Sequence, residues 1–402
     1  MTKLRDLISE EQIAKVRSPI ETAAWLPNST FTSPSFFQLE VDKLFSKTWI
    51  SIGFVDDVRN CGDAFPLTTL GGIPIVMVRD ESGELRVFHN ICPHDGCFAI
   101  WSPKKFMSRI VGNYHGWVWN LDGSLRNATL FDGSAEIQSL PDRDADLKEI
   151  RSAVWQDTVF INLSGDAPEF EEYIAPVEEL YADIDLSNLV VATSKDSSEA
   201  MIDRFTFDAN WKNVYENFAI NVYHEGFTHD EYKAAPNVPR VTPEGRRKFE
   251  EVDDRGYHGL KFDEAESDLA YGLAATPKLL RKDGRPHDWN TIMTLYPNTN
   301  ISLFPNFLLI TVLSPHAADS TGYDTILRIP RSVDRDARYF DKCEFMLLND
   351  WGYARNEDAE VLKRVQQGRH SPVYDQHFFS PFWESMSHGF CNRILDDLET
   401  NE

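Results

Sequence analysis

Positive charge, cysteine and long apolar runs are all scarce in this 402-residue sequence. Forty Lys and Arg face 64 Asp and Glu, and the formal net charge of -24 repels phosphate backbones. Five cysteines at irregular spacing form no disulfide framework, in keeping with a reducing compartment. No run approaches the ~20 apolar residues that span a bilayer, and residues 1–6 lack an export segment. We expect a cytoplasmic protein with no nucleic-acid or membrane partner. The acidity is interpreted first as serving solubility, and docking to a basic electron donor is the weaker interpretation.

The residues that are present suit a globular protein of two or three domains. With 42% hydrophobic and 26% charged residues, the chain can bury substantial cores. The pattern predicts a short helix at 34–47, strands at 73–78, 85–88 and 158–163, and a turn-forming boundary from Ser164 to Pro168. We therefore expect an N-terminal segment with a helix, an all-β domain and a larger domain, at residues 1–47, 48–165 and 166–402.

The larger domain mixes helical and extended patterns, which predicts an α+β fold. Its expected elements are an acidic helix, a strand, a long helical stretch from Ala209, further strands, and a last helix that stops at Gly368. The acidic helix is expected at 169–180, the strand at 201–207, the further strands at 294–313 and 325–329, and the last helix at 356–367.

A cysteine and histidine pattern lies between residues 92 and 115. Cys92-Pro93-His94 is followed, after seventeen residues, by Gly112-Asn113-Tyr114-His115. Two thiolates and two imidazoles hold a Rieske [2Fe-2S] cluster, so a complete site reads C-x-H and then C-x-x-H. Together with Tyr114-His115-Gly116-Trp117 and the Asp122-Gly123 hairpin turn, this window resembles the Rieske domain of the large (alpha) subunit of aromatic-ring-hydroxylating and choline, betaine and carnitine oxygenases. It departs from that family at three positions: Asp95 for arginine, Asn113 for proline and Gly112 for cysteine.

Gly112 stands where the second cysteine ligand belongs. Glycine has no side chain, so Cys92 is the only thiolate left beside the imidazoles of His94 and His115. Two alternatives stay open: Cys97 replaces the missing thiolate, or the Cys, His, His trio holds zinc with a water. We expect a degenerate Rieske site and no normal [2Fe-2S] cluster in the isolated chain.

A second constellation lies on the helical stretch after Ala209. His224 and His229 are five residues apart, about 140° around a regular helix, so they converge on one metal only if the helix breaks between them. Gly226 is the predicted break. With a carboxylate they form the two-histidine-one-carboxylate set that binds Fe(II) and leaves positions open. From the residues alone, two ordinary surface or core histidines remain an alternative.

The resemblance assigns these residues further. Glu216-Asn217-Phe218 followed by Tyr223-His224 and His229 is similar to the family's mononuclear Fe(II) motif. The family's carboxylate ligand corresponds to Asp358, although Glu357 and Glu360 lie nearby and an acid in the first turn of a helix is favoured by the dipole alone. Three residues before His224, on the same helical face, the family has a bridging carboxylate, where this chain has Asn221. Asn221 and Asn217 are the candidate catalytic residues. Phe218, Phe227 and Asn217 are candidates for lining a pocket, although aromatic residues on such a helix are more often part of the core.

The resemblance also implies an activity and an assembly. It implies an all-β Rieske-like domain followed by a helix-grip-like catalytic domain with an antiparallel sheet, in trimers or hexamers where the cluster of one subunit feeds the iron of the next. Gly112 affects the sending side of that path and Asn221 the receiving side. We expect an oxygenase subunit that hydroxylates, dihydroxylates or demethylates a small organic substrate with O2, a ferredoxin or flavin reductase, and a homologous partner subunit with an intact cluster. The alternative is a non-catalytic pseudo-subunit that stabilises a hetero-oligomer.

Overall fold

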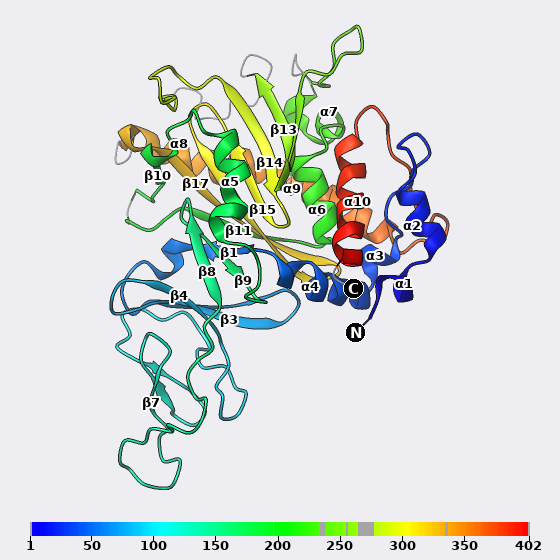
Figure 1. Ribbon diagram of the computed structural model, residues 1–402. Coiled ribbons are helices and arrows are strands. Elements are labelled where there is room, and N and C mark those ends of the chain that lie inside the picture. Colours follow the sequence, from blue (N-terminus) through cyan, green and yellow to red (C-terminus); the bar gives the residue numbers. More distant parts are fainter. Residues whose placement is uncertain are drawn as a thin grey trace. The chain divides into compact units, whose positions relative to one another are not determined.

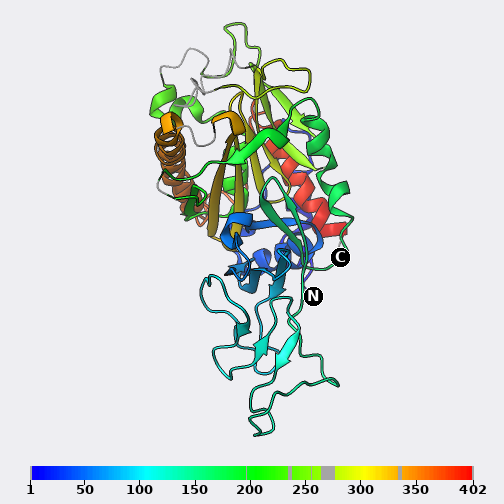
Figure 2. The same cartoon turned by 90° about the vertical axis from the view of Figure 1, so that its left-hand side faces the viewer.

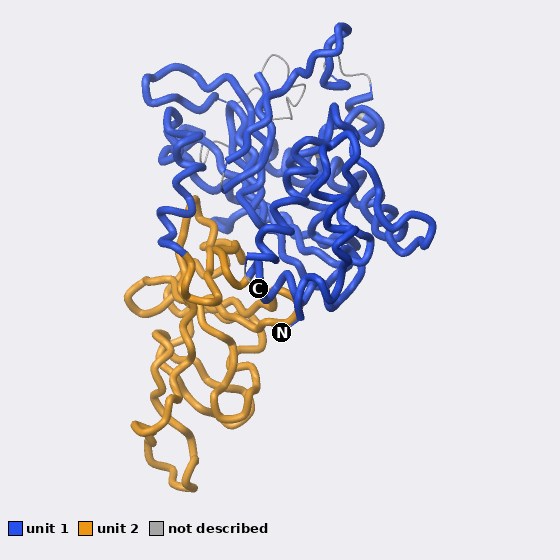
Figure 3. The backbone as a smooth tube through the Cα atoms, turned by 45° about the vertical axis from the view of Figure 1, so that its right-hand side comes forward, with its two compact units in different colours: residues 1–45, 168–402 blue, residues 46–167 orange. Residues whose placement is uncertain are grey.

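The computed structural model describes residues 2–195, 197–233, 238–254, 256–263, 277–333 and 337–400. The chain divides into two compact units, a smaller one of residues 46–167 and a larger one of residues 1–45 and 168–402 (Figure 3). The expected N-terminal segment, 1–47, thus falls almost wholly in the same unit as the C-terminal half. Among the described residues, none of the helices has the length and apolarity needed to cross a membrane.

The smaller unit is all-β, as predicted. It contains three antiparallel sheets of three strands each, ordered β1-β9-β8, β2-β3-β4 and β5-β6-β7 (Figure 1). Their bounds are β1 (Ile50–Phe54), β2 (Ala64–Thr69), β3 (Ile73–Arg79), β4 (Leu85–His89), β5 (Ile110–Val111), β6 (Val118–Trp119), β7 (Leu125–Asn127), β8 (Arg151–Trp155) and β9 (Thr158–Asn162).

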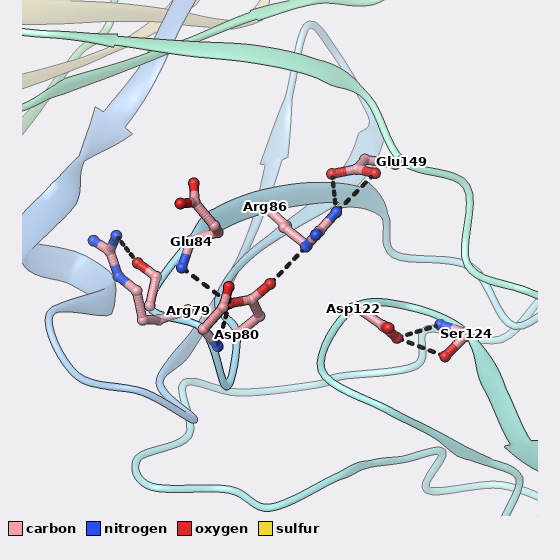
Figure 4. Close-up of polar contacts among 9 residues, drawn as sticks. Arg79, Asp80, Glu84, Arg86, Asp122, Ser124 and Glu149 are labelled. Carbon is pink, nitrogen blue, oxygen red and sulfur yellow. Dashed lines mark hydrogen bonds and ion pairs between the residues drawn. The ribbon is translucent and has the colours of Figure 1, made fainter.

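Charged side chains hold the turn between β3 and β4. Asp80 accepts hydrogen bonds from the backbone N–H groups of Ser82 and Glu84, both at 2.9 Å, and from Arg86 Nε at 2.8 Å (Figure 4). Arg86 also reaches Glu149 at 3.0 Å, just before β8. Burial raises the pKa of Asp80, but the bonds from Arg86 and Ser82 outweigh it and hold that pKa at about 2. The network therefore works with an ionised Asp80 and fixes the strands that lead into the loop at Cys92.

An eight-stranded antiparallel sheet forms the centre of the larger unit. Its order is β10-β17-β16-β15-β14-β13-β12, and β11 pairs with β17 beside β10. The central strands are buried along almost their whole length, so both faces of the sheet are covered. The bounds are β10 (Leu189–Val191), β11 (Ile202–Phe207), β12 (Glu250–Asp253), β13 (Tyr257–Asp263), β14 (Trp289–Leu295), β15 (Thr299–Leu303), β16 (Leu308–Ala317) and β17 (Ser320–Pro330).

The helices of this unit come from its N-terminal segment, from between the strands of the sheet and from the C-terminal part of the chain. Figure 1 shows α6 beside the sheet, where it contacts β13, β14, β16 and β17 as well as α9. In Figure 2 the red C-terminal helix α10 also lies beside the sheet. The bounds are α1 (Leu4–Leu7), α2 (Glu10–Val16), α3 (Ser29–Thr32), α4 (Pro34–Lys43), α5 (Phe170–Leu180), α6 (Trp211–Ala219), α7 (Glu225–Thr228), α8 (Ala337–Phe345), α9 (Trp351–Gly368) and α10 (Ser385–Thr400).

The start of α6 is anchored to α4 by a buried ion pair. Lys212 Nζ lies 2.6 Å from Glu40 Oε1, both side chains are at most 1% exposed, and Trp211 Nε1 donates to Glu40 Oε2 at 3.0 Å. Asn210 caps the helix by accepting from the Lys212 backbone N–H. This end of α6 is therefore fixed, and the helix carries the polypeptide toward the histidine motif.

Two predictions about the helices need correction. The predicted end of the helix at Gly368 is correct, but the helix begins at Trp351, well before the predicted Asn356. It is also not the last helix, because α10 follows. The apolar side chains of α10, including Phe390, Ile394 and Leu398, are buried, so this helix completes the core of the larger unit.

Candidate metal centre

His224 and His229 flank the single-turn helix α7. Residues 220–224 after α6 are not helical, His224 directly precedes α7, and His229 directly follows it. The predicted break at Gly226 was wrong, because Gly226 lies inside α7 and the chain leaves the helix earlier, at Ile220. The short turn brings the two imidazole rings to a centroid separation of 5.3 Å.

Asp358 of α9 completes a three-residue group. Its Oδ1 atom lies 3.5 Å from His224 Nε2 and 3.5 Å from His229 Nε2. Two atoms that both bind a divalent ion at about 2.1 Å lie about 3–3.5 Å apart, so an ion fits between them with little movement. Asp358 is seven residues inside α9 rather than in its first turn, so helix-dipole stabilisation does not account for it.

Polar neighbours orient these side chains toward the centre. Glu357 Oε2 lies 3.0 Å from His229 Nδ1, which leaves Nε2 to face Asp358. Burial lowers the pKa of His224, but the hydrogen bond and charge of Asp358, together with the charges of Glu225 and Glu216, raise it further than burial lowers it. Within the described residues, the buried Oδ1 of Asp358 has no hydrogen-bond partner. A buried carboxylate oxygen facing two imidazoles is the arrangement expected of a metal ligand set.

A buried ion pair holds α7 in place. Arg240 Nε donates to Glu225 Oε2 at 2.6 Å, and Arg240 Nη2 donates to the other carboxylate oxygen at 3.2 Å. The guanidinium also lies 4.3 Å from the centroid of the Phe262 ring. Because Glu225 follows His224 directly, this bidentate contact fixes the turn that positions both histidines.

The three-residue group forms part of the wall of a pocket with about 70 Å³ of free space. Asn217 and Phe218 line it, as predicted, whereas Phe227 is 72% exposed and is not at the pocket. Arg355, one helical turn before Asp358, also reaches the wall and pairs with Asp203. Most of the remaining lining is apolar or aromatic: Phe207, Val214, Tyr232, Leu260, Ile292, Tyr323, Trp351 and Leu362.

Asn221 lies between two carboxylates. Its Nδ2 group donates to Glu216 Oε1 and to Glu384 Oε1, the latter at 3.3 Å, and its Oδ1 accepts from the Tyr223 backbone N–H at 2.8 Å. The predicted placement of Asn221 on one helical face with His224 is wrong, since both residues follow the end of α6. The side-chain amide of Asn221 is nevertheless hydrogen-bonded to specific partners within the chain.

The loops of the smaller unit bring Cys92, His94 and His115 to one region, but they do not suit a Rieske cluster. The rings of His94 and His115 are 4.7 Å apart, and Cys92 is buried. Gly112 lines the same small pocket without supplying a ligand, and Asp95 Oδ2 lies 2.5 Å from His115 Nδ1, so that nitrogen is not free to bind iron. Among the described residues, the convergent ligand atoms there come from His94, Asp95 and His115, so Cys97 is not part of the group.

Sequence reasoning missed several residues of both sites. The sequence offers Glu357 only as a competing ligand and carries no signal for its contact with His229. Arg355 could have been found, because a residue three positions before Asp358 lies on the same face of a helix. The meeting of Asp95 with His115 had no such signal, since it joins two loops twenty residues apart.

Two family models match the chain. One, described as the Rieske [2Fe-2S] domain, covers residues 48–141, and the other, described as the ring hydroxylating alpha subunit (catalytic domain), covers residues 175–400. Choline monooxygenase of Arabidopsis thaliana is 27% identical over 93% of this chain and 83% of its own length. The carnitine monooxygenase oxygenase subunit of Escherichia coli is 29% identical over 59% of this chain and 65% of its own.

The fold is also similar to solved structures. One is a quaternary ammonium Rieske monooxygenase described in terms of carnitine oxidation and inter-subunit electron transfer. It has a TM-score of 0.69 at 21% identity, over 93% of this chain and 95% of that chain. At this identity the similarity establishes the fold alone.

Proposed function

The chain belongs to the family of ring-hydroxylating alpha subunits, and from this premise we propose that it is an oxygenase subunit with Fe(II) held by His224, His229 and Asp358. The observation that supports this most is the convergence of those three ligand atoms, all within 4.8 Å of one another, at the wall of a largely apolar pocket. Fe(II) held by this set leaves coordination positions open for O2 and substrate. The relatives are oxidoreductases of the same class.

The surrounding residues have separate roles in this proposal. Glu357 holds the His229 ring so that Nε2 faces the ion. The Glu225–Arg240 pair keeps α7, and with it both histidines, in register. The apolar walls exclude water from the reacting positions.

We infer that the substrate is a small quaternary ammonium compound. Relatives named for choline and carnitine act on such compounds, and this pocket supplies aromatic faces that attract a desolvated cation. Phe218 is one of its lining residues, and its ring centroid lies 5.3 Å from that of Trp351 and 5.7 Å from that of Tyr323. Arg355 is paired with Asp203 and stacked 4.4 Å from the Phe205 ring. Because a guanidinium repels another cation, we place the cationic end of the substrate away from Arg355.

The electrons come from outside this chain in our proposal. Gly112 removes a cluster ligand, so a homologous partner subunit with an intact [2Fe-2S] cluster, served by a ferredoxin or flavin reductase, supplies them in a trimer or hexamer. The alternative, a non-catalytic pseudo-subunit, is favoured by the same Gly112.

Iron binding tests the site directly. We expect His224→Ala and His229→Ala each to bind one equivalent of Fe(II) fewer per chain than wild type, measured anaerobically by a chromogenic chelator. Glu360→Gln is the matched control, because Glu360 is an exposed acid on the same helix that pairs with Arg364. Choline, glycine betaine and carnitine are then titrated calorimetrically into the iron-loaded protein. Equal iron binding by wild type and both histidine variants contradicts the assignment.

A further inference from the structure

The degenerate cluster loops contain a second convergent group of metal-ligand atoms. His115 Nδ1 lies 2.5 Å and His94 Nδ1 lies 3.6 Å from the same oxygen, Asp95 Oδ2. The two imidazole planes are inclined at 74°, so the nitrogens approach that oxygen from different directions. Two imidazoles and one carboxylate are the same donor types that converge in the larger unit.

The backbone holds both loops in a compact form. In the first loop, Cys92 N–H donates to Cys97 C=O at 2.7 Å, and Cys97 N–H donates to Asp95 Oδ1 at 2.8 Å. In the second, Gly112 N–H donates to Trp117 C=O at 2.9 Å. The Trp117 ring stacks on His94 at a centroid distance of 5.0 Å. The donor atoms are therefore positioned by main-chain bonds and packing, whether or not an ion is bound.

We propose that His94, Asp95 and His115 bind one divalent transition-metal ion of the zinc class, which joins the two loops in place of the iron–sulfur cluster. An ion bonded to both Nδ1 atoms and Asp95 Oδ2 at about 2.1 Å requires donor separations of about 3–3.5 Å. The His94 separation of 3.6 Å exceeds this range by only about 0.1 Å. The His115 contact opens by about 1 Å, within reach of side chains that are 34% and 41% exposed for the two histidines.

The donor set decides the class of ion. Imidazole nitrogen favours zinc and its neighbours over Mg²⁺ and Ca²⁺, which prefer all-oxygen sites. Cys92 is buried and does not belong to the convergent group, so the ion is held without a thiolate, by Asp95 and by the two histidines of the cluster motif. This site is independent of the proposed oxygenase activity, because it lies wholly in the smaller unit.

Zinc binding by the full-length chain tests the site. His224→Ala/His229→Ala serves as the background, so that the larger unit contributes no imidazole ligands. Zn²⁺ is titrated in competition with a chromogenic chelator, and Co²⁺ is used as an absorbance probe of coordination. We expect one ion per chain, and an affinity at least about tenfold lower after Asp95→Asn or His115→Ala.

Two controls separate this site from its alternatives. Cys92→Ser keeps the ion, whereas it would remove one bound by thiolate. Asp142→Asn, an exposed acid in the same unit, also keeps it, and circular dichroism checks that each variant is folded. The proposal is overturned if the background protein binds no stoichiometric zinc, if both Asp95→Asn and His115→Ala bind it unchanged, or if Cys92→Ser loses it. In the first case Asp95 is only a hydrogen-bond acceptor for His115.

Discussion

At the scale of single residues, Gly112 decides whether the smaller unit carries a cluster. Its backbone does not need glycine, because an added Cβ would meet only the Trp119 ring edge at 3.3 Å and Trp117 C=O at 3.6 Å. The loop has also kept its turn, with Gly116 N–H bonded to Gly112 C=O at 3.1 Å. The lost ligand therefore leaves a site whose shape still accepts a thiol after a small shift.

We predict no Rieske signal from the wild-type chain after anaerobic reconstitution with iron and sulfide. Gly112→Cys combined with Asp95→Arg supplies the missing thiolate and removes the carboxylate from His115, so this variant is expected to acquire the signal. Low-temperature electron paramagnetic resonance and visible absorption measure it. Gly112→Ala with Asp95→Arg is the control, since it adds the Cβ without sulfur. A stoichiometric signal from wild type would contradict the prediction.

Asn221 and its two carboxylates predict a pH effect on stability. Burial raises the pKa of Glu384 to about 7, and burial also raises the pKa of Glu216. A raised carboxyl pKa means that stability is complete below about pH 4.5 and is lost as pH rises through about 7. Glu384→Gln keeps the oxygen that accepts from Asn221, loses the one that accepts from the Ser380 backbone N–H, and cannot ionise. Because the lost bond counts equally at both pH values, the variant should be more stable relative to wild type at pH 8 than at pH 5, by about 1–2 kcal/mol allowing for partial solvation.

Thermal unfolding midpoints at the two pH values measure this effect. Asn221→Asp replaces two donated hydrogen bonds by a third carboxylate, so we expect it to lower the midpoint at pH 8, and Glu384→Gln to restore part of the loss. If Glu384→Gln shifts the midpoint equally at pH 5 and pH 8, ionisation of Glu384 is not the cause.

At the scale of elements, the buried pair between α4 and α6 is the most sensitive contact. Lys212→Met leaves Glu40 buried with only the Trp211 bond, and we expect it to lower the free energy of unfolding by about 3–5 kcal/mol. The neutral double variant Lys212→Met/Glu40→Gln should recover most of this. Urea unfolding measures both.

The exposed pair Lys363–Asp208 is the matched control, with side chains 47% and 69% exposed. Lys363→Met should change the free energy of unfolding by less than about 1 kcal/mol. A similar loss for Lys212→Met and for the double variant would mean that lost packing, rather than an unpaired charge, is responsible.

Elements with strong local patterns were predictable, and those set by tertiary contacts were not. The strands around Ile75 and Val87 and the helix stop at Gly368 follow from alternation and from a terminal glycine. The exit from α6 at Ile220 was not predictable, because no proline or glycine stands there and the chain turns to meet α9. For α10 the signal existed, since Phe390, Ile394 and Leu398 recur every four residues.

Prediction of the two metal-ligand groups from the sequence is limited in the same way. Resemblance located His224, His229 and Asp358, and their convergence agrees with it. Local sequence could not show that Glu357 faces His229, because that depends on how α9 is rotated against α7. Asp95 was visible only as a departure from the family pattern.

At the scale of the whole molecule, the chain has all three candidate iron ligands but has Gly112 in place of one cluster ligand. This combination predicts complementation by a homologue. The purified chain should not oxidise choline, glycine betaine or carnitine with any reductase, because Gly112 supplies no thiolate for the cluster that would deliver electrons. Co-expressed with a homologue that has an intact cluster, it should form a mixed oligomer that does. O2 consumption and product mass spectrometry measure turnover, and robust oxygenation by the pure chain would refute the need for a partner.

The sharpest form of this experiment uses a homologue whose own iron ligands have been replaced. Its cluster can then deliver electrons, but only this chain can hold the catalytic iron, so turnover by the mixed complex must occur at His224, His229 and Asp358. Adding His224→Ala to this chain should abolish that turnover, whereas Glu360→Gln should leave it unchanged. If the mixed complex assembles and is inactive, while a complex of this chain with the unmodified homologue is active and insensitive to His224→Ala, the chain is a structural subunit. Turnover and assembly are measured on the same purified complex, so a failure of electron delivery is distinguished from a failure to associate.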